Sequence, residues 1–165
     1  MTLDRLGSPV IRVDIARQEL SVAEHGRARK RYRVSTSKFG TGCVRDSFRT
    51  PLGRHIVRAK IGGGQPLGAV FVGRRPTGEV YSADLARAYP DRDWILTRIL
   101  WLSGLEVGKN RLGDVDTMRR YIYIHGTPDS DVLGTPTSIG CVRMSNVAIL
   151  ELYDMIPVGT IVLIE

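Results

Sequence analysis

Two side chains of this sequence have the types needed for nucleophilic catalysis, the thiol of Cys141 and the imidazole of His125. Cys141 lies in the compact segment SIGCVR at 138–143, and His125 directly follows the apolar run YIYI at 121–124. A thiol reacts as its thiolate, so a nucleophilic cysteine needs a base or a cation beside it, and an imidazole titrating near neutral pH serves as both. The pair therefore predicts a Cys/His enzyme. The alternative is a packed thiol and an unrelated surface imidazole, the commoner situation for a lone Cys and a lone His.

The neighbours of Cys141 favour the catalytic interpretation. Gly140 allows the backbone to approach a substrate closely, and Arg143 supplies a planar positive group two positions after the thiol. Arg143 has two possible roles, binding a substrate carboxylate or bracing the loop. For Ser138 we expect a hydroxyl that satisfies backbone groups of the loop rather than one that takes part in the reaction.

The sequence around these residues resembles a known family. The motif HGT at 125–127, a short polar loop and the motif S-x-G-C-x-R-M at 138–144 together resemble the signature of the L,D-transpeptidase catalytic domain, the YkuD-type family that crosslinks peptidoglycan stem peptides. The likeness extends to residues 11–22, to YRVST at 32–36 and to TPLG at 50–53, so it covers most of the chain. One position departs from the family pattern, because Ile139 replaces the usual second histidine. Isoleucine can neither take a proton nor donate a hydrogen bond, so His125 must be the base.

The resemblance implies a mainly β domain (a β-rich α+β fold), an L,D-transpeptidase-like β-sandwich or barrel with a few short helices. It also implies that Cys141 attacks a donor stem peptide, forms a thioester and passes the acyl group to an amine of a second stem peptide. His125 would be the base, with the Gly126 carbonyl or a loop group fixing its tautomer. The backbone N–H groups of Gly140 and Cys141 are the expected oxyanion donors. We expect no cofactor and no metal, and we expect carbapenems to acylate Cys141.

Three classes of function are compatible with these residues. The first is a peptidoglycan transpeptidase, and the second is an L,D-carboxypeptidase or endopeptidase that hydrolyses the same acyl-enzyme. The third is a non-catalytic wall-binding module, for which the substitution at Ile139 is the one sequence indication. Retention of both Cys141 and His125 argues against the third class.

Composition indicates one enzyme-sized domain over residues 1–165. The chain has 42% hydrophobic and 25% charged residues, which is ordinary globular usage. Its net charge of +7 includes a basic cluster that we interpret as a solvated outer strand face, although such a face also attracts an anionic polymer. No helix-turn-helix, zinc-finger spacing or aromatic-interleaved RNA motif accompanies the cluster, so nucleic acid is disfavoured as a partner. The cluster consists of Arg27, Arg29, Lys30, Arg31 and Arg33.

The expected partners are peptidoglycan stem peptides, with a monomer favoured. Residues 1–9 contain no apolar core of signal-peptide length, and no stretch approaches the roughly 20 apolar residues of a membrane span. The resemblance nevertheless implies a periplasmic or cell-envelope location. Cys43, in a glycine-rich loop, is expected to be structural or free. A less favoured hypothesis is a regulatory disulfide between Cys43 and Cys141.

The elements that position these residues are predicted to be mostly strands. Apolar residues alternate with polar ones over 11–15, 20–22 and 32–36, which is typical of half-buried strands. Residues 94–102 form a strongly apolar strand, and 160–164 form the last one. The glycine-rich segments 40–43 and 62–64 are interpreted as turns, because neither has the lysine of a phosphate-binding loop.

A strand over 121–125 is predicted to deliver His125, with Tyr121 and Tyr123 on the same face as the imidazole. A short helix is predicted over 82–88, and a longer amphipathic helix after the N-cap Ser145. His25 and His55 have no Cys or carboxylate at metal-ligand spacing, so we interpret them as surface or strand residues.

Overall fold

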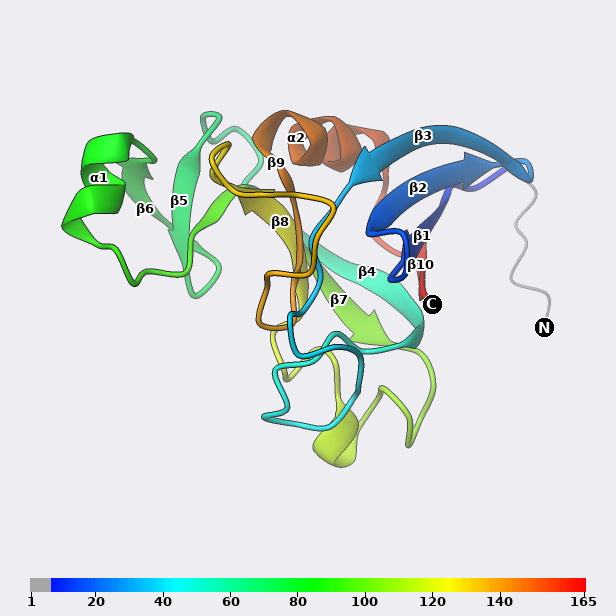
Figure 1. The fold of residues 1–165 in the computed structure, drawn as a ribbon. Helices are drawn as coiled ribbons and strands as arrows, with labels where there is room; N and C mark the ends of the chain where they lie inside the picture. The colour runs from blue at the N-terminus through cyan, green and yellow to red at the C-terminus, as the bar shows by residue number, and fades with distance from the viewer. Residues whose placement is uncertain (1–6) are drawn as a thin grey trace.

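A mixed, curled β-sheet forms the body of the protein in the computed structural model, which describes residues 7–165 (Figure 1). Residues 1–6, part of the segment considered above for an export signal, lie outside the described part. Neighbouring strands follow the order β3-β2-β1-β10-β4-β7-β5-β6, and β8 pairs with both β7 and β9. The prediction of a mainly β fold with a few short helices is confirmed. The strands are β1 (Val10–Asp14), β2 (Glu19–Glu24), β3 (Arg27–Arg33), β4 (Gly53–Ile61), β5 (Ala69–Val72), β6 (Arg75–Val80), β7 (Ile95–Gly104), β8 (Tyr123–Thr127), β9 (Val142–Ser145) and β10 (Ile161–Ile164).

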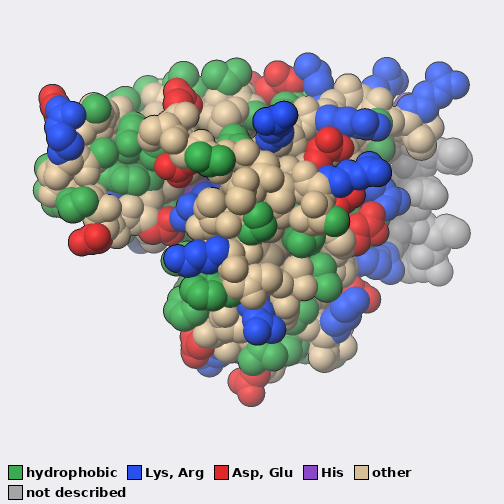
Figure 2. Space-filling view, in the orientation of Figure 1, with side chains coloured by type: hydrophobic (Ala, Val, Ile, Leu, Met, Phe, Trp, Pro, Cys, Tyr) green, Lys and Arg blue, Asp and Glu red, His purple; other side chains and the backbone are tan. Residues whose placement is uncertain are grey.

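The first three strands form an antiparallel meander whose period-2 pattern is realised in the core. Ile11 of β1 lies opposite Val22 of β2, and Val13 lies opposite Leu20. All four side chains are fully buried. The next strand, β3, is almost entirely exposed, and Lys and Arg side chains gather at this edge of the molecule (Figure 2). The basic cluster is therefore a solvated strand face, as predicted.

Helix α2 (Asn146–Met155) covers the sheet beside β7, β8 and β9 (Figure 1). Its N-cap is the predicted Ser145, whose hydroxyl accepts a hydrogen bond from the Ala148 N–H at 3.1 Å. Ile149 and Leu152 point into the main core and are fully buried. The shorter helix α1 (Ala83–Ala88) has Ser82 as its N-cap, so both predicted helices are confirmed. A 3₁₀ turn, η1 (Gly113–Val115), is the remaining helical element of the described residues.

The strand that carries His125 begins later than predicted. β8 starts at Tyr123, and Tyr121 lies in a turn in which its N–H donates to the Met118 carbonyl. Tyr121 has a φ of +55°, which a β-strand does not permit. The predicted 121–125 strand was therefore wrong at its start. Likewise, β3 ends at Arg33, before the end of the predicted 32–36 strand.

Candidate active site

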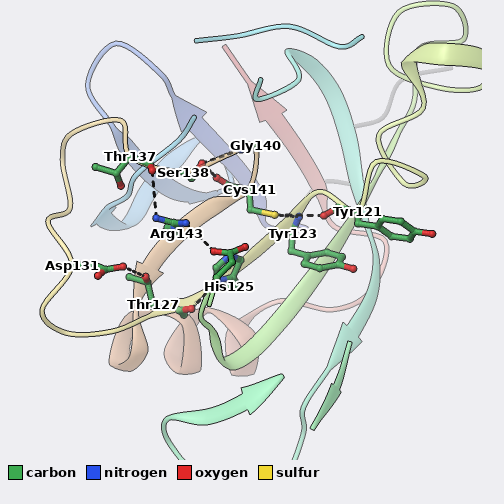
Figure 3. A network of polar contacts seen from close by, with 12 residues as sticks. Tyr121, Tyr123, His125, Thr127, Asp131, Thr137, Ser138, Gly140, Cys141 and Arg143 are labelled. Atoms are coloured by element: carbon green, nitrogen blue, oxygen red, sulfur yellow. Dashed lines mark hydrogen bonds and ion pairs between the residues drawn. The ribbon is translucent and has the colours of Figure 1, made fainter. Parts of the chain in front are cut away.

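A parallel pairing of β8 with β9 brings the two candidate catalytic residues together. Ile124 lies opposite Val142, and His125 lies opposite Arg143. Cys141 directly precedes β9, and the Tyr123 N–H donates to its Sγ at 3.3 Å. Because side chains two positions apart on a strand share a face, His125 lies on the same face as Tyr123, the residue whose N–H contacts the thiol (Figure 3).

His125 is held in one tautomer by its own neighbour. Its ring is 1% exposed, and Nδ1 lies 2.7 Å from the Gly126 carbonyl oxygen. A carbonyl only accepts, so this contact places the proton on Nδ1 and leaves a lone pair on Nε2. Burial lowers the pKa of His125 below its usual value, an effect opposed by the Gly126 carbonyl and by the charge of Asp93. The imidazole is therefore neutral at neutral pH and has a basic nitrogen available.

Cys141 is half-buried. It packs against a small apolar cluster that includes Phe71, Ile99 and Tyr123. Burial raises the pKa of Cys141 to about 12, although the Tyr123 N–H favours the thiolate. At neutral pH the site therefore holds a protonated thiol beside a neutral imidazole, and the thiol must lose its proton as it reacts.

Ser138 organises the loop in front of the nucleophile. Its hydroxyl donates to the Cys141 carbonyl at 2.6 Å and accepts from the Gly140 N–H at 3.2 Å. The Gly140 carbonyl accepts from the Thr50 hydroxyl at 3.0 Å, and Gly140 has a φ of +131°, which favours glycine. The Gly140 amide can therefore serve an oxyanion only if its hydrogen bond to Ser138 opens. Ser138 itself makes the backbone contacts that its loop position suggested.

Arg143 makes bracing contacts on both sides. Nη2 lies 2.9 Å from the Asp93 carboxylate, and Nη1 donates to the Thr137 carbonyl at 3.5 Å. The Arg143 side chain is 17% exposed and that of Asp93 is 43% exposed, so water reaches this ion pair from the carboxylate side. Asp93 was missed in the sequence, where it lies fifty positions from Arg143 and in no recognisable motif. Its charge also acts on both Cys141 and His125.

Ile139, the substitution in the family pattern, separates two clefts. The side chain is 45% exposed and lines both of them. One cleft, of about 370 Å³, also involves Lys38, Asp93 and Arg143. The other, of about 200 Å³, is lined by Phe48 and Arg120 among others. The position at which the resemblance led us to expect a histidine thus holds an apolar side chain that lines two clefts.

Cys43 and Cys141 are both free thiols, so the structure contains no disulfide between them. The guanidinium of Arg120 lies near both sulfur atoms. Arg120 is fixed by hydrogen bonds to the Gly42 carbonyl at 3.2 Å and the Arg49 carbonyl at 2.6 Å. The loop that carries Cys43 therefore lies beside the candidate active site, and sequence reasoning missed the arginine that joins the two.

The metal-binding residue types of the described part of the chain are dispersed. Within residues 7–165, no group of three or more His, Cys, Asp or Glu side chains is arranged to hold a metal ion. His55 lies in β4 and is fully buried, whereas His25 lies in the turn between β2 and β3. The described residues also include no helix long and apolar enough to cross a membrane.

The curled sheet pairs the strand that carries His125 with the strand that follows Cys141, and comparison with known proteins identifies the family of this fold. The family model of the L,D-transpeptidase catalytic domain matches residues 8–164. The chain belongs to this YkuD family. No curated protein matches the chain.

Solved structures of similar fold are distant in sequence. An L,D-transpeptidase from Mycobacterium smegmatis is 18% identical with a TM-score of 0.56, and the match covers 96% of this chain and 59% of that one. L,D-transpeptidase 3 from Mycobacterium tuberculosis, in complex with a faropenem-derived adduct, is 16% identical with a TM-score of 0.59. That match covers 96% of this chain and 60% of the other. An L,D-transpeptidase from Xylanimonas cellulosilytica is 21% identical with a TM-score of 0.54, and the match covers 99% of this chain and 63% of the other. These similarities concern the fold, and the chain spans about three fifths of the length of these structures.

Proposed function

We propose that this protein is a cysteine-dependent L,D-transpeptidase that crosslinks peptidoglycan stem peptides in the cell envelope. The observation that carries the proposal is the orientation of His125. Its Nδ1 faces the Gly126 carbonyl at 2.7 Å, which leaves the lone pair of Nε2 free, and the β8–β9 pairing brings the strand of His125 alongside the strand that follows Cys141. Membership of the YkuD family supplies the substrate class.

The reaction begins with the neutral thiol. As Sγ of Cys141 attacks the carbonyl carbon of the donor peptide, Nε2 of His125 takes the thiol proton. The tetrahedral intermediate collapses, the peptide C–N bond breaks, and His125 returns the proton to the amine of the departing D-residue. The acyl group remains on Cys141 as a thioester. The high pKa of the thiol, about 12, makes this base necessary at neutral pH.

The second half transfers the acyl group. The amine of a second stem peptide attacks the thioester and gives a proton to His125, and the thiolate leaves and is reprotonated. The Cys141 amide, and the Gly140 amide once freed from Ser138, are the proposed donors to the oxyanion, each contributing roughly 3 kcal/mol.

Incubation with a tetrapeptide-stem muropeptide, with and without an amine acceptor, tests the proposal. We expect a crosslinked product by mass spectrometry when the acceptor is present. A tripeptide product that forms equally with and without acceptor would identify a hydrolase, and an unchanged substrate would indicate a wall-binding module. A carbapenem should add one drug mass to the tryptic peptide that contains Cys141. Labelling elsewhere would contradict the nucleophile assignment.

A further inference from the structure

Arg74 occupies an unusual position next to the candidate active site. It lies in the two-residue turn between β5 and β6, where Gly73 and Arg74 have φ values of +54° and +67°. Such turns favour Gly, Asn or Asp, and a left-handed backbone at arginine costs roughly 1 to 2 kcal/mol. Strain of this kind is commonly retained where a side chain has a function.

The side chain of Arg74 is held over aromatic rings. Its Cζ lies 4.6 Å from the ring centre of Trp101 and 4.9 Å from that of Tyr121. Nη1 donates to the Tyr123 hydroxyl at 2.9 Å. These contacts fix the plane of the guanidinium while leaving most of its five N–H donors uncommitted within residues 7–165.

Arg74 is also without an acidic partner in the part of the chain that the structure describes. A fixed guanidinium with no counter-charge favours binding of an external carboxylate, which it engages through two parallel N–H···O bonds. Arg143, by contrast, is already paired with Asp93. The described ion pairs involve Arg12, Arg17, Arg29, Lys30, Arg31, Arg87, Arg92, Lys109 and Arg143.

Tyr123 connects this guanidinium to the nucleophile. Its backbone N–H contacts Sγ of Cys141, and its hydroxyl contacts Arg74, so one tyrosine side chain separates the two groups. The rings of Tyr121 and Tyr123 lie on the same side of Cys141 (Figure 3). In a peptide, the carboxylate of the last residue lies about 3.8 Å beyond the preceding carbonyl carbon, close to the spacing of successive Cα atoms. A carboxylate one residue beyond a carbonyl at Cys141 would extend past the backbone of Tyr123 toward the side of its ring, where Arg74 contacts the hydroxyl.

We propose that Arg74 binds the free carboxylate of the donor's terminal D-residue and thereby directs Cys141 to the peptide bond one residue from the end of the stem. This inference rests on the proposed function. It adds a specificity-determining residue that distinguishes a stem with a free carboxyl end from one whose end is blocked. The carboxylate leaves with the departing amine, so the contact involves the donor and not the acyl-enzyme.

Binding measurements test the inference without requiring turnover. A stem tetrapeptide and its C-terminal carboxamide are titrated calorimetrically into full-length Cys141→Ala protein, with or without Arg74→Gln. We expect the free acid to bind at least ten times more tightly than the amide when Arg74 is present, because a charge-assisted bidentate contact is lost in the amide. Arg74→Gln should reduce this ratio to about one while changing amide affinity by less than about twofold.

Two further variants make the outcome decisive. Arg75→Gln removes an exposed charge from the adjacent position of the same hairpin and should keep the tenfold ratio. Arg74→Gly removes the side chain at a φ that glycine adopts freely, and it should abolish the ratio as Arg74→Gln does. A ratio that survives either Arg74 substitution overturns the inference. An equal loss of acid and amide binding would also overturn it, since that result indicates a merely structural brace. Failure of the wild-type protein to convert any muropeptide would refute the proposed function separately.

Discussion

His55 and His125 are two buried histidines of the same sheet that differ in their hydrogen bonds, and only the second is proposed to take part in catalysis. His55 is fully buried and His125 is 1% exposed. In both, Nδ1 lies near a backbone carbonyl, at 3.0 Å from Gly53 for His55 and 2.7 Å from Gly126 for His125. The two rings differ in the hydrogen bonding of their second nitrogen, Nε2. Nε2 of His55 is paired with the Thr117 hydroxyl at 3.1 Å, whereas Nε2 of His125 has no hydrogen-bond partner within residues 7–165.

This difference shows that burial and a lowered pKa do not by themselves identify a catalytic histidine. Burial lowers the pKa of His55 to about 4 and also lowers the pKa of His125. Both rings are neutral at neutral pH. A general base additionally needs an unpaired nitrogen next to a proton that must move, and of these two residues His125, for which we propose that role, has the Nε2 that is unpaired within the described residues.

His125 is proposed to act on a thiol, whereas His55 has no such partner in the described part of the chain. Cys141→Ala should abolish transpeptidation, with a loss of at least about a thousandfold, because no other group can form the thioester. The melting temperature should change little. The matched control is Cys43→Ala, which removes the other free thiol and should leave turnover within about threefold. Comparable muropeptide conversion by the Cys141 variant would remove its assignment as nucleophile.

Exchange of each histidine tests the comparison directly. His125→Gln should lower kcat/KM by about 10² to 10⁴, the usual contribution of a positioned base. His55→Gln should leave kcat/KM within about threefold but lower the free energy of unfolding by about 1 to 3 kcal/mol, because two buried hydrogen bonds are disturbed. Steady-state kinetics measure kcat/KM, and urea unfolding measures the free energy of unfolding. Loss of activity in the His55 variant at unchanged stability would show that His55 also takes part in the reaction.

Acid should reveal His55 as a stability element. Its pKa of about 4 in the folded protein lies below the ordinary value of 6.5. Between these values the unfolded chain takes up a proton that the folded protein does not. The stabilisation is therefore complete above pH 6.5 and falls by up to about 3 kcal/mol as the pH approaches 4. Urea unfolding across this range should show a steeper decline for the wild type than for His55→Gln, and parallel curves would contradict a lowered His55 pKa.

The smallest effect is expected from restoring the family's usual histidine. In Ile139→His, an imidazolium near the thiol should raise Cys141 alkylation by iodoacetamide less than about threefold at pH 6, because this position is 45% exposed and screened by water. The gain should vanish by pH 8, where the new imidazole is neutral. Ile139→Gln, which is polar but never charged, serves as the control. A gain that persists at pH 8 would indicate a steric rather than an electrostatic effect.

Local sequence patterns by themselves determine several strands and helix starts of this protein. The alternation around Ile11 and Val13 predicted β1, and Ser145 predicted the start of α2, because strand faces and helix caps depend on residues only two or three positions apart. The types of His125 and Cys141 indicated the chemistry, because few side chain pairs can supply a nucleophile and a base. The start of β8 was misplaced, since the left-handed turn at Tyr121 leaves no mark in an apolar alternating run.

The environment of the site was decided by tertiary structure. Asp93 reaches Arg143 from a loop fifty positions away, and Arg74 reaches Tyr123 from a separate hairpin. The thiol pKa of about 12 arises from burial against β5 and β7, which no property of residues 138–143 encodes. Likewise, His55 and His125 are the same residue type. The tertiary structure distinguishes them, because it pairs His55 with Thr117 and places His125 on the strand beside β9. Contacts between distant segments arise only when the sheet closes, because strand pairing and desolvation depend on the whole chain.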